Sequence, residues 1–66
     1  MHMYVVQLGK TGMDGFRTIE SSNVLAKNVE AARVRTIDLL KTRGAQLGCN
    51  KAQLLGEHQQ VVYEYP

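Results

Sequence analysis

The sequence predicts an α+β fold: a small, mostly antiparallel sheet with one main helix packed on one of its faces. Two observations predict it. Short segments near both ends of the chain are rich in β-branched and aromatic residues, and a glycine-rich loop with an Asp-Gly pair follows the first of them, as in a β-hairpin. Between these segments, residues 29–43 carry apolar side chains at helical spacing. A chain of 66 residues is expected to form a single domain, 1–66.

The hairpin is predicted from two strands and the loop between them. Met3–Leu8, with the sequence MYVVQL, has the composition of a strand. Residues 9–15, GKTGMDG, supply three glycines, which adopt positive φ at no steric cost, and are expected to form the loop. Phe16–Ser21 then forms the return strand. Residues 21–27, SSNVLAK, fit either a continuation of this strand or an early helix start capped by a serine, and the strand is the prediction adopted.

The main helix is predicted over residues 29–43. Asn28 is a good N-cap, and Glu30 falls in the first turn, where the helix dipole favours a negative charge. Gly44 is the expected stop, with basic residues in the turn before it. At 100° per residue one broad stripe faces the sheet. Its members are Val29, Ala32, Thr36, Ile37, Leu39 and Leu40.

The C-terminal third is predicted to add a short helical turn and a last strand. Asn50 has the chemistry to cap one turn of helix over residues 51–56, KAQLLG, which would turn its two leucines inward. Gln59–Tyr65, QQVVYEY, closes the chain as a strand. Its alternation places Val61, Tyr63 and Tyr65 on one face and Val62 on the other.

The amino-acid composition indicates the cellular compartment in which the protein is expected. Cys49 is the only cysteine, so no internal disulfide is possible and a reducing compartment is the expected home. No apolar run approaches the roughly 18 residues that a membrane span requires, and no signal-peptide pattern opens the chain. A cytoplasmic protein without a membrane partner is the expectation.

The sequence holds no complete catalytic or metal-binding motif. Gly-Lys-Thr at 9–11 matches the end of a phosphate-binding P-loop, but Tyr4 occupies the position of the required upstream glycine, and a strand rather than a helix follows. His2, Cys49 and His58 have no ligand-like spacing and no nucleophile motif around them. The six acidic residues are scattered singly along the chain. We therefore expect no enzyme activity, cofactor, metal or small-molecule substrate.

The first functional hypothesis rests on the strands. Tyr4 and Val6 point to one face of the first strand, and Met3 and Val5 point to the other. A single helix covers one face of a small sheet, so the second face would expose apolar side chains, which usually mark an interface. The expected function is a small protein-binding module that docks on a partner protein or forms a homodimer, as a modulator or inhibitor of the kind that a phage or mobile element encodes. The residues proposed for the interface are Tyr4, Val6, Tyr63 and Tyr65.

Two alternatives to an exposed interface stay open. The same four residues would instead form the core if the helix covers their face. The segment 45–56, AQLGCNKAQLLG, would hide the second face if it folds across it.

The second functional hypothesis is a nucleic-acid-binding domain. Residues 33–51 hold five basic residues against a single acidic one, Asp38. On a helical wheel these cations point in separate directions, which favours a solvated helix back over a phosphate-binding face. In the nucleic-acid alternative, sheet tyrosines stack on bases while cations neutralise phosphates. The cations assigned to that role are Arg33, Arg35, Arg43 and Lys51.

The order of elements is also similar in outline to small antitoxin domains of the HicB kind. The stretches that carry it are YVVQL, GFRTIES and NVLAKNVEAARVRTIDLL, over roughly the first forty residues. The resemblance implies a hairpin followed by a helix that opens on an acidic-alanine step. The Gly-Asp-Thr entry to the helix and a separate DNA-binding segment are both absent, so we do not treat it as family membership.

Overall fold

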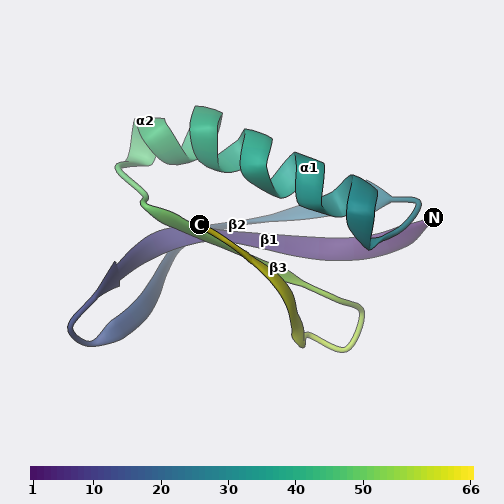
Figure 1. Ribbon diagram of the computed structural model, residues 1–66, viewed down its shortest axis with the longest axis horizontal. Helices are drawn as coiled ribbons and strands as arrows, with labels where there is room; N and C mark the ends of the chain where they lie inside the picture. The colour runs from purple at the N-terminus through teal and green to yellow at the C-terminus, as the bar shows by residue number, and fades with distance from the viewer.

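The computed structural model describes residues 1–66 and confirms the α+β prediction. Four antiparallel strands form one sheet, and a helix lies across one face of it (Figure 1). The strands are β1 (His2–Gly12), β2 (Gly15–Ala26), β3 (Lys51–Leu55) and β4 (Val61–Tyr65). The helix is built from α1 (Val29–Leu39), a π-helical turn (Leu40–Gly44) and α2 (Ala45–Leu47), which follow one another without a break.

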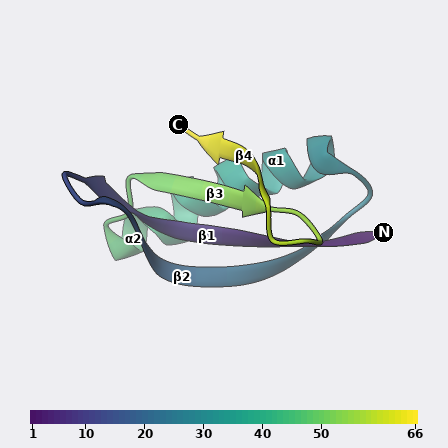
Figure 2. The same cartoon turned by 90° about the horizontal axis from the view of Figure 1, so that it is seen from below.

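The strands are arranged in the order β2-β1-β3-β4, so β1 lies inside the sheet (Figure 2). It pairs with β2 along its whole length and with β3 over Val5–Gly9. The prediction that residues 21–27 continue the return strand is confirmed as far as Ala26, where β2 ends.

The hydrophobic core fills the space between the helix and the sheet. From the helix, Ala32, Thr36 and Leu40 are buried at the four-residue spacing that keeps side chains on one side. The Thr36 hydroxyl, fully buried, donates to the carbonyl oxygen of Ala32 at 2.8 Å, so its polarity is satisfied within the helix. The sheet contributes Tyr4, Val6, Leu8, Val24, Ala26, Ala52 and Leu54.

The helix begins where predicted and ends later. The Asn28 side chain accepts a hydrogen bond from the backbone N–H of Ala31 at 2.9 Å, which makes it the N-cap. The predicted stop at Gly44 is wrong, because Gly44 has helical dihedrals and is buried. A Cβ there would lie 2.9 Å from Leu40 Cδ1, so the missing side chain makes room for a core leucine. The chain leaves the helix at Gly48, whose φ of 74° is the left-handed conformation that glycine favours.

None of the helical segments is both long and apolar enough to cross a membrane.

The predicted helical turn over residues 51–56 is also wrong, because Lys51–Leu55 is β3. Its residues are good helix formers, but β1 presents a second edge of unpaired N–H and C=O groups that needs a partner. Pairing with β1 at Leu8–Ala52 and Val6–Leu54 satisfies that edge and buries Ala52 and Leu54 under the helix. Long-range pairing therefore overrides the local preference.

The last strand starts later than predicted and is irregular. β4 begins at Val61 instead of Gln59. Leu54 pairs with Tyr63 but Leu55 pairs with Val61, so Val62 is an extra residue in a bulge. The predicted common face of Val61 and Tyr63 is therefore wrong: Val61 lies on the side of Leu55, while Val62 and Tyr63 pack against the core.

The β1–β2 hairpin projects beyond the rest of the sheet (Figure 1). Its strands are longer than predicted, and only Met13 and Asp14 remain in the turn between Gly12 and Gly15. The Asn50 side chain supports the ribbon at its base: it accepts from the backbone N–H of Thr11 at 2.9 Å and donates to the carbonyl oxygen of Thr11 at 3.5 Å. The last backbone pair between β1 and β3 is Gly9–Lys51. Beyond it, the Asn50 side chain makes the hydrogen bonds to Thr11 that a strand backbone would otherwise make.

Candidate functional site

The helix leaves one face of the sheet uncovered, and we call this the open face. Seen from that side, the sheet lies in front of the helix (Figure 2). The open face carries the β1 residues that alternate with the buried Tyr4, Val6 and Leu8, together with their pairing partners on the other strands. These residues are Met3, Val5, Gln7 and Gly9 of β1, Thr18, Ser21, Asn23 and Leu25 of β2, Lys51, Gln53 and Leu55 of β3, and Val61 and Glu64 of β4.

One end of the open face is apolar. Met3 pairs with Leu25, and Val5 pairs with Leu55, which in turn pairs with Val61. Three of these side chains keep about half of their surface in water: Met3 at 46%, Leu25 at 57% and Val61 at 49%. We call these five residues the apolar cluster. Leu55 is buried at 9%, yet it lies outside the core cluster, because it is on the opposite side of the sheet.

A polar row crosses the sheet next to the apolar cluster. Ser21, Gln7, Gln53 and Glu64 are neighbours in register from β2 to β4. The Gln53 amide donates to Glu64 at 2.8 Å, and Lys51 Nζ lies 3.7 Å from the other oxygen of the same carboxylate. The only two charges of the open face therefore neutralise each other. In a strand with one solvated face, apolar residues on the core side alternate with polar residues on the solvent side. The polar row follows this pattern. The apolar cluster departs from it, because its residues are apolar although they lie on the side away from the core.

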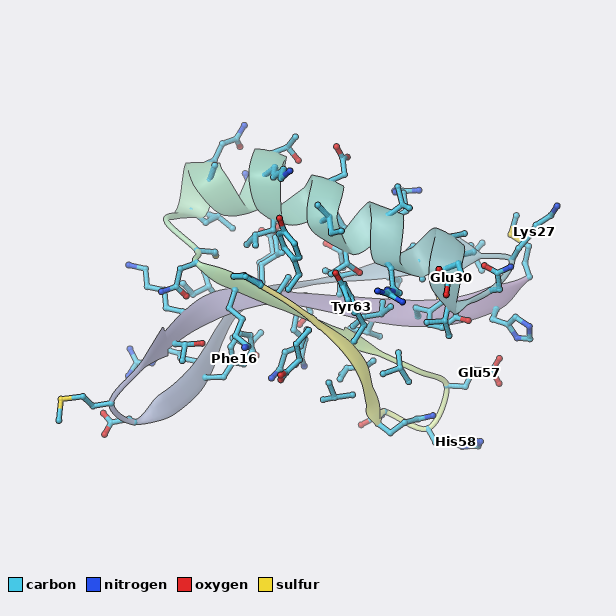
Figure 3. The ribbon with its side chains drawn as sticks, viewed as in Figure 1. Phe16, Lys27, Glu30, Glu57, His58 and Tyr63 are labelled. Atoms are coloured by element: carbon cyan, nitrogen blue, oxygen red, sulfur yellow. The ribbon has the colours of Figure 1, made fainter.

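The four residues predicted for a protein interface lie on the other side of the sheet. Tyr4 and Val6 are buried beneath the helix, at 6% and 0% exposure, which is the core alternative that the sequence left open. Tyr63 and Tyr65 are half-buried and pack against the same core. Figure 3 shows Tyr63 between β4 and the helix, where the Arg33 guanidinium lies 4.4 Å from the ring centroid.

The segment that was expected to hide the second face does not do so. Residues 45–56 form the end of the helix and then β3, inside the sheet, so this segment does not fold across the open face.

Three of the four cations assigned to nucleic acid have acidic partners within the molecule. Arg43 makes two hydrogen bonds to Glu20, at 2.9 and 3.0 Å. Arg33 lies 3.6 Å from Glu30, and Lys51 pairs with Glu64. Arg35 is exposed and makes no ion pair. The four cations do not form one cationic surface. Three of them pair with three different glutamates, and the fourth, Arg35, has no acidic partner.

The Glu20–Arg43 pair ties the middle of β2 to the far part of the helix. The bidentate geometry is the strong form of an arginine–carboxylate contact. The Arg43 hydrogen bonds and charge hold the pKa of Glu20 below its ordinary value, and the same contact raises the pKa of Arg43. Arg43 also donates to Gln46, one turn further along the helix, at 3.2 Å.

The cysteine and histidine side chains, which have the chemistry for catalysis or metal binding, lie apart from one another. Cys49 is half-buried in the connection between α2 and β3. His58 lies in the turn after the end of β3 (Figure 3). His2 Nδ1 is 2.7 Å from Glu57, at the rim of a depression of about 260 Å³ next to Tyr4, Val29 and Val62. A second depression, of about 350 Å³, lies at the β1–β2 hairpin between Lys10 and Arg17, and Met13 is its only hydrophobic lining residue. Ligand pockets are mainly apolar, and neither depression has such a lining. No group of three His, Cys, Asp or Glu side chains is placed to hold a metal ion.

Sequence reasoning missed most of the apolar cluster. The predicted alternation of Met3 and Val5 with Tyr4 and Val6 is confirmed, but the face predicted to be exposed, that of Tyr4 and Val6, is the one that the helix covers. Leu25 lay in the ambiguous stretch 21–27, and Leu55 in a predicted helical turn. The sequence does carry one signal for the apolar cluster: Met3 and Val5 alternate with core residues, so they must lie on the face opposite the core.

Comparison with known proteins identifies no relative: no family model, curated protein or solved structure matches the chain.

Proposed function

We propose that this protein is a small non-enzymatic binding module that docks on protein through the open face of its sheet. A modulator or inhibitor that occupies a partner's surface is the role that such a module would fill. Its lone free thiol suits a reducing compartment, and we place it in the cytoplasm.

The observation that carries the proposal is the apolar cluster. Met3, Leu25 and Val61 come from three different strands, and each exposes about half of its side chain on one continuous face. Scattered surface apolar residues are ordinary, but a contiguous patch beside polar residues is a feature of interfaces. Water contact with these side chains costs free energy that docking would recover.

The nucleic-acid alternative has less support. A phosphate-binding surface requires cations that are free and lie on one side. Arg33, Arg43 and Lys51 are each engaged with a carboxylate, and the face of the Tyr63 ring that would stack on a base is occupied by Arg33. Tyr4 is buried.

The test compares two aspartate substitutions. Leu25→Asp places a charge in the apolar cluster, and Val34→Asp places one on the solvent side of the helix, where Val34 is 67% exposed. Each tagged variant is used for capture from a lysate of the source organism, with and without nuclease, after circular dichroism has shown that it is folded.

A protein retained by the wild type and by Val34→Asp, but lost with Leu25→Asp, would support the proposal. Retention that disappears on nuclease treatment would favour the nucleic-acid alternative. If Leu25→Asp captures the same proteins as the wild type and also self-associates as the wild type does, the open face is not the docking surface.

A further inference from the structure

We propose that the partner on the open face is a second copy of this chain, packed face to face about a two-fold axis with the helices outward. This inference rests on the proposed function, since it names the occupant of the same surface. It predicts a symmetric dimer whose buried layer is formed by two open faces.

The chemistry of the face is self-complementary. In a two-fold dimer the same surface of both molecules forms the interface. Unpaired charges of one sign on that surface would therefore face the same charges on the other copy and be repelled. The open face has no such charge, because Lys51 and Glu64 pair with each other. Gln7 and Gln53 carry amides, which donate and accept, and can therefore bond to their own copies. A partner of different chemistry would not require this neutrality.

The size of the molecule leaves room for an interface of specific size. Figure 1 looks along the shortest axis with the helix above the sheet, so the open face lies within the plane of the longest and shortest axes of the molecule, 34 and 17 Å. The outline of the whole molecule in that plane is about 580 Å², which is an upper limit on the area that one open face offers. Twice that limit is above the roughly 1,000 Å² of total buried area that separates specific interfaces from chance contacts.

The edges of the sheet are less suited to self-association than its face. β2 carries an extra residue, Ile19, between the pairs Leu8–Glu20 and Gly9–Thr18, and β4 carries its own bulge at Val62. Bulges twist an edge strand away from the flat geometry that edge-to-edge pairing requires. The open face is not covered by the helix, and Met3, Leu25 and Val61 remain exposed on it.

The size of the core gives a further reason. Only 14 of the 66 residues are buried, and domains of this length often gain stability by oligomerising. Packing two open faces would create a second apolar layer from the two copies of Met3, Val5, Leu25, Leu55 and Val61.

The test measures molecular mass in solution by analytical ultracentrifugation, from micromolar to near-millimolar protein. Two variants place aspartate at opposite margins of the open face: Leu25→Asp on β2 and Val61→Asp on β4. The matched control is Val34→Asp on the helix. Circular dichroism and a cooperative thermal transition establish that each variant is folded before its mass is interpreted.

A wild type that reaches twice its 7.4 kDa monomer mass, with both face variants shifted at least tenfold towards monomer and the control unchanged, would support the dimer. A wild type that stays monomeric throughout would overturn it, and the lysate capture would then decide the proposed function separately. Dissociation by Leu25→Asp alone would indicate pairing through the β2 edge and would also reject the face-to-face arrangement. If a face variant does not fold, Leu25→Gln and Val61→Thr are used in its place and judged by the same criteria.

Discussion

At Gly9 the backbone of β2 lies too close to β1 to admit a side chain. A Cβ at this position would be 2.0 Å from the carbonyl oxygen of Arg17 and 2.9 Å from the ring of Phe16. The bulge at Ile19 brings the β2 backbone over this point, and Phe16 extends on the side of the sheet away from the helix (Figure 3). The glycine is therefore required by space; its φ does not lie in the left-handed region.

Gly9→Ala is expected to destabilise the fold by about 1–3 kcal/mol, because the backbone of Arg17 must shift to admit the methyl group. Gly12→Ala is the matched control, since a Cβ there meets nothing within 4 Å. Urea denaturation of both variants measures the difference. Equal stability of the two would contradict the close approach.

The Glu20–Arg43 pair makes stability depend on pH in a defined direction. The pKa of Glu20 is lowered in the folded state by its hydrogen bonds to Arg43. Its contribution is therefore present above the pKa of the unfolded chain and is lost as the pH falls through the lower, folded pKa.

Glu20→Gln is expected to remove this part of the acid dependence. Thermal melting from neutral pH downwards should show a shallower loss of stability in the variant than in the wild type. Asp38→Asn serves as the comparison, because the Asp38 carboxylate is exposed and makes no ion pair. An unchanged slope in Glu20→Gln would show that the pair does not persist in solution.

At the scale of elements, one arginine adds a polar link between the helix and β4. Arg33 lies over the Tyr63 ring and also lies 3.6 Å from Glu30, one turn earlier on the helix. β4 is an edge strand that pairs with β3 alone, so this contact adds a link from the helix to the margin of the sheet.

Arg33→Met keeps most of the aliphatic length but removes the charge. We expect a loss of roughly 0.5–1 kcal/mol, the range of an exposed cation–π contact. Arg35→Met is the control, because Arg35 has no ion-pair partner and is expected to tolerate the change. Chemical denaturation measures stability, and hydrogen exchange of the β4 amides measures whether the loss is local.

The elements that could be predicted from the sequence are those whose signals are local. The strand at Met3–Leu8, the return strand and the cap at Asn28 depend on composition and short-range hydrogen bonds. The end of the helix could not be predicted, because Gly44 is selected by packing against Leu40 and not by its backbone angles. β3 could not be predicted either, because its pairing with β1 joins residues far apart in the chain.

The candidate site shows the same limit. Alternation in β1 correctly separates Tyr4 and Val6 from Met3 and Val5. It does not indicate which face the helix covers, since both carry apolar residues. The bulge at Val62 then reverses the expected side of Val61, and a single extra residue of this kind leaves no clear mark in the sequence.

The whole molecule consists of two layers, one helix and one sheet, and the helix covers only one face of the sheet. The helix and the inner face of the sheet enclose the core, and the outer face lies away from the helix (Figures 1 and 2). If two molecules share that face, folding and association are linked, and stability becomes a function of concentration.

The midpoint of thermal unfolding is therefore expected to rise with protein concentration, by roughly 5 °C for each tenfold increase while the dimer remains associated up to the transition. Leu25→Asp should show a midpoint that is independent of concentration. Differential scanning calorimetry over two decades of concentration makes the comparison. A constant midpoint in the wild type would indicate a monomer that folds alone.

The central position of β1 has a consequence for biosynthesis. Its partner on one side, β2, leaves the ribosome soon after it, but its partner on the other side, β3, follows only after the whole helix. At the usual rate of about 5–20 residues per second, the nascent chain exposes the second edge of β1 for seconds. During that interval the strand that later lies inside the sheet is the part most open to capture by chaperones or by other nascent chains.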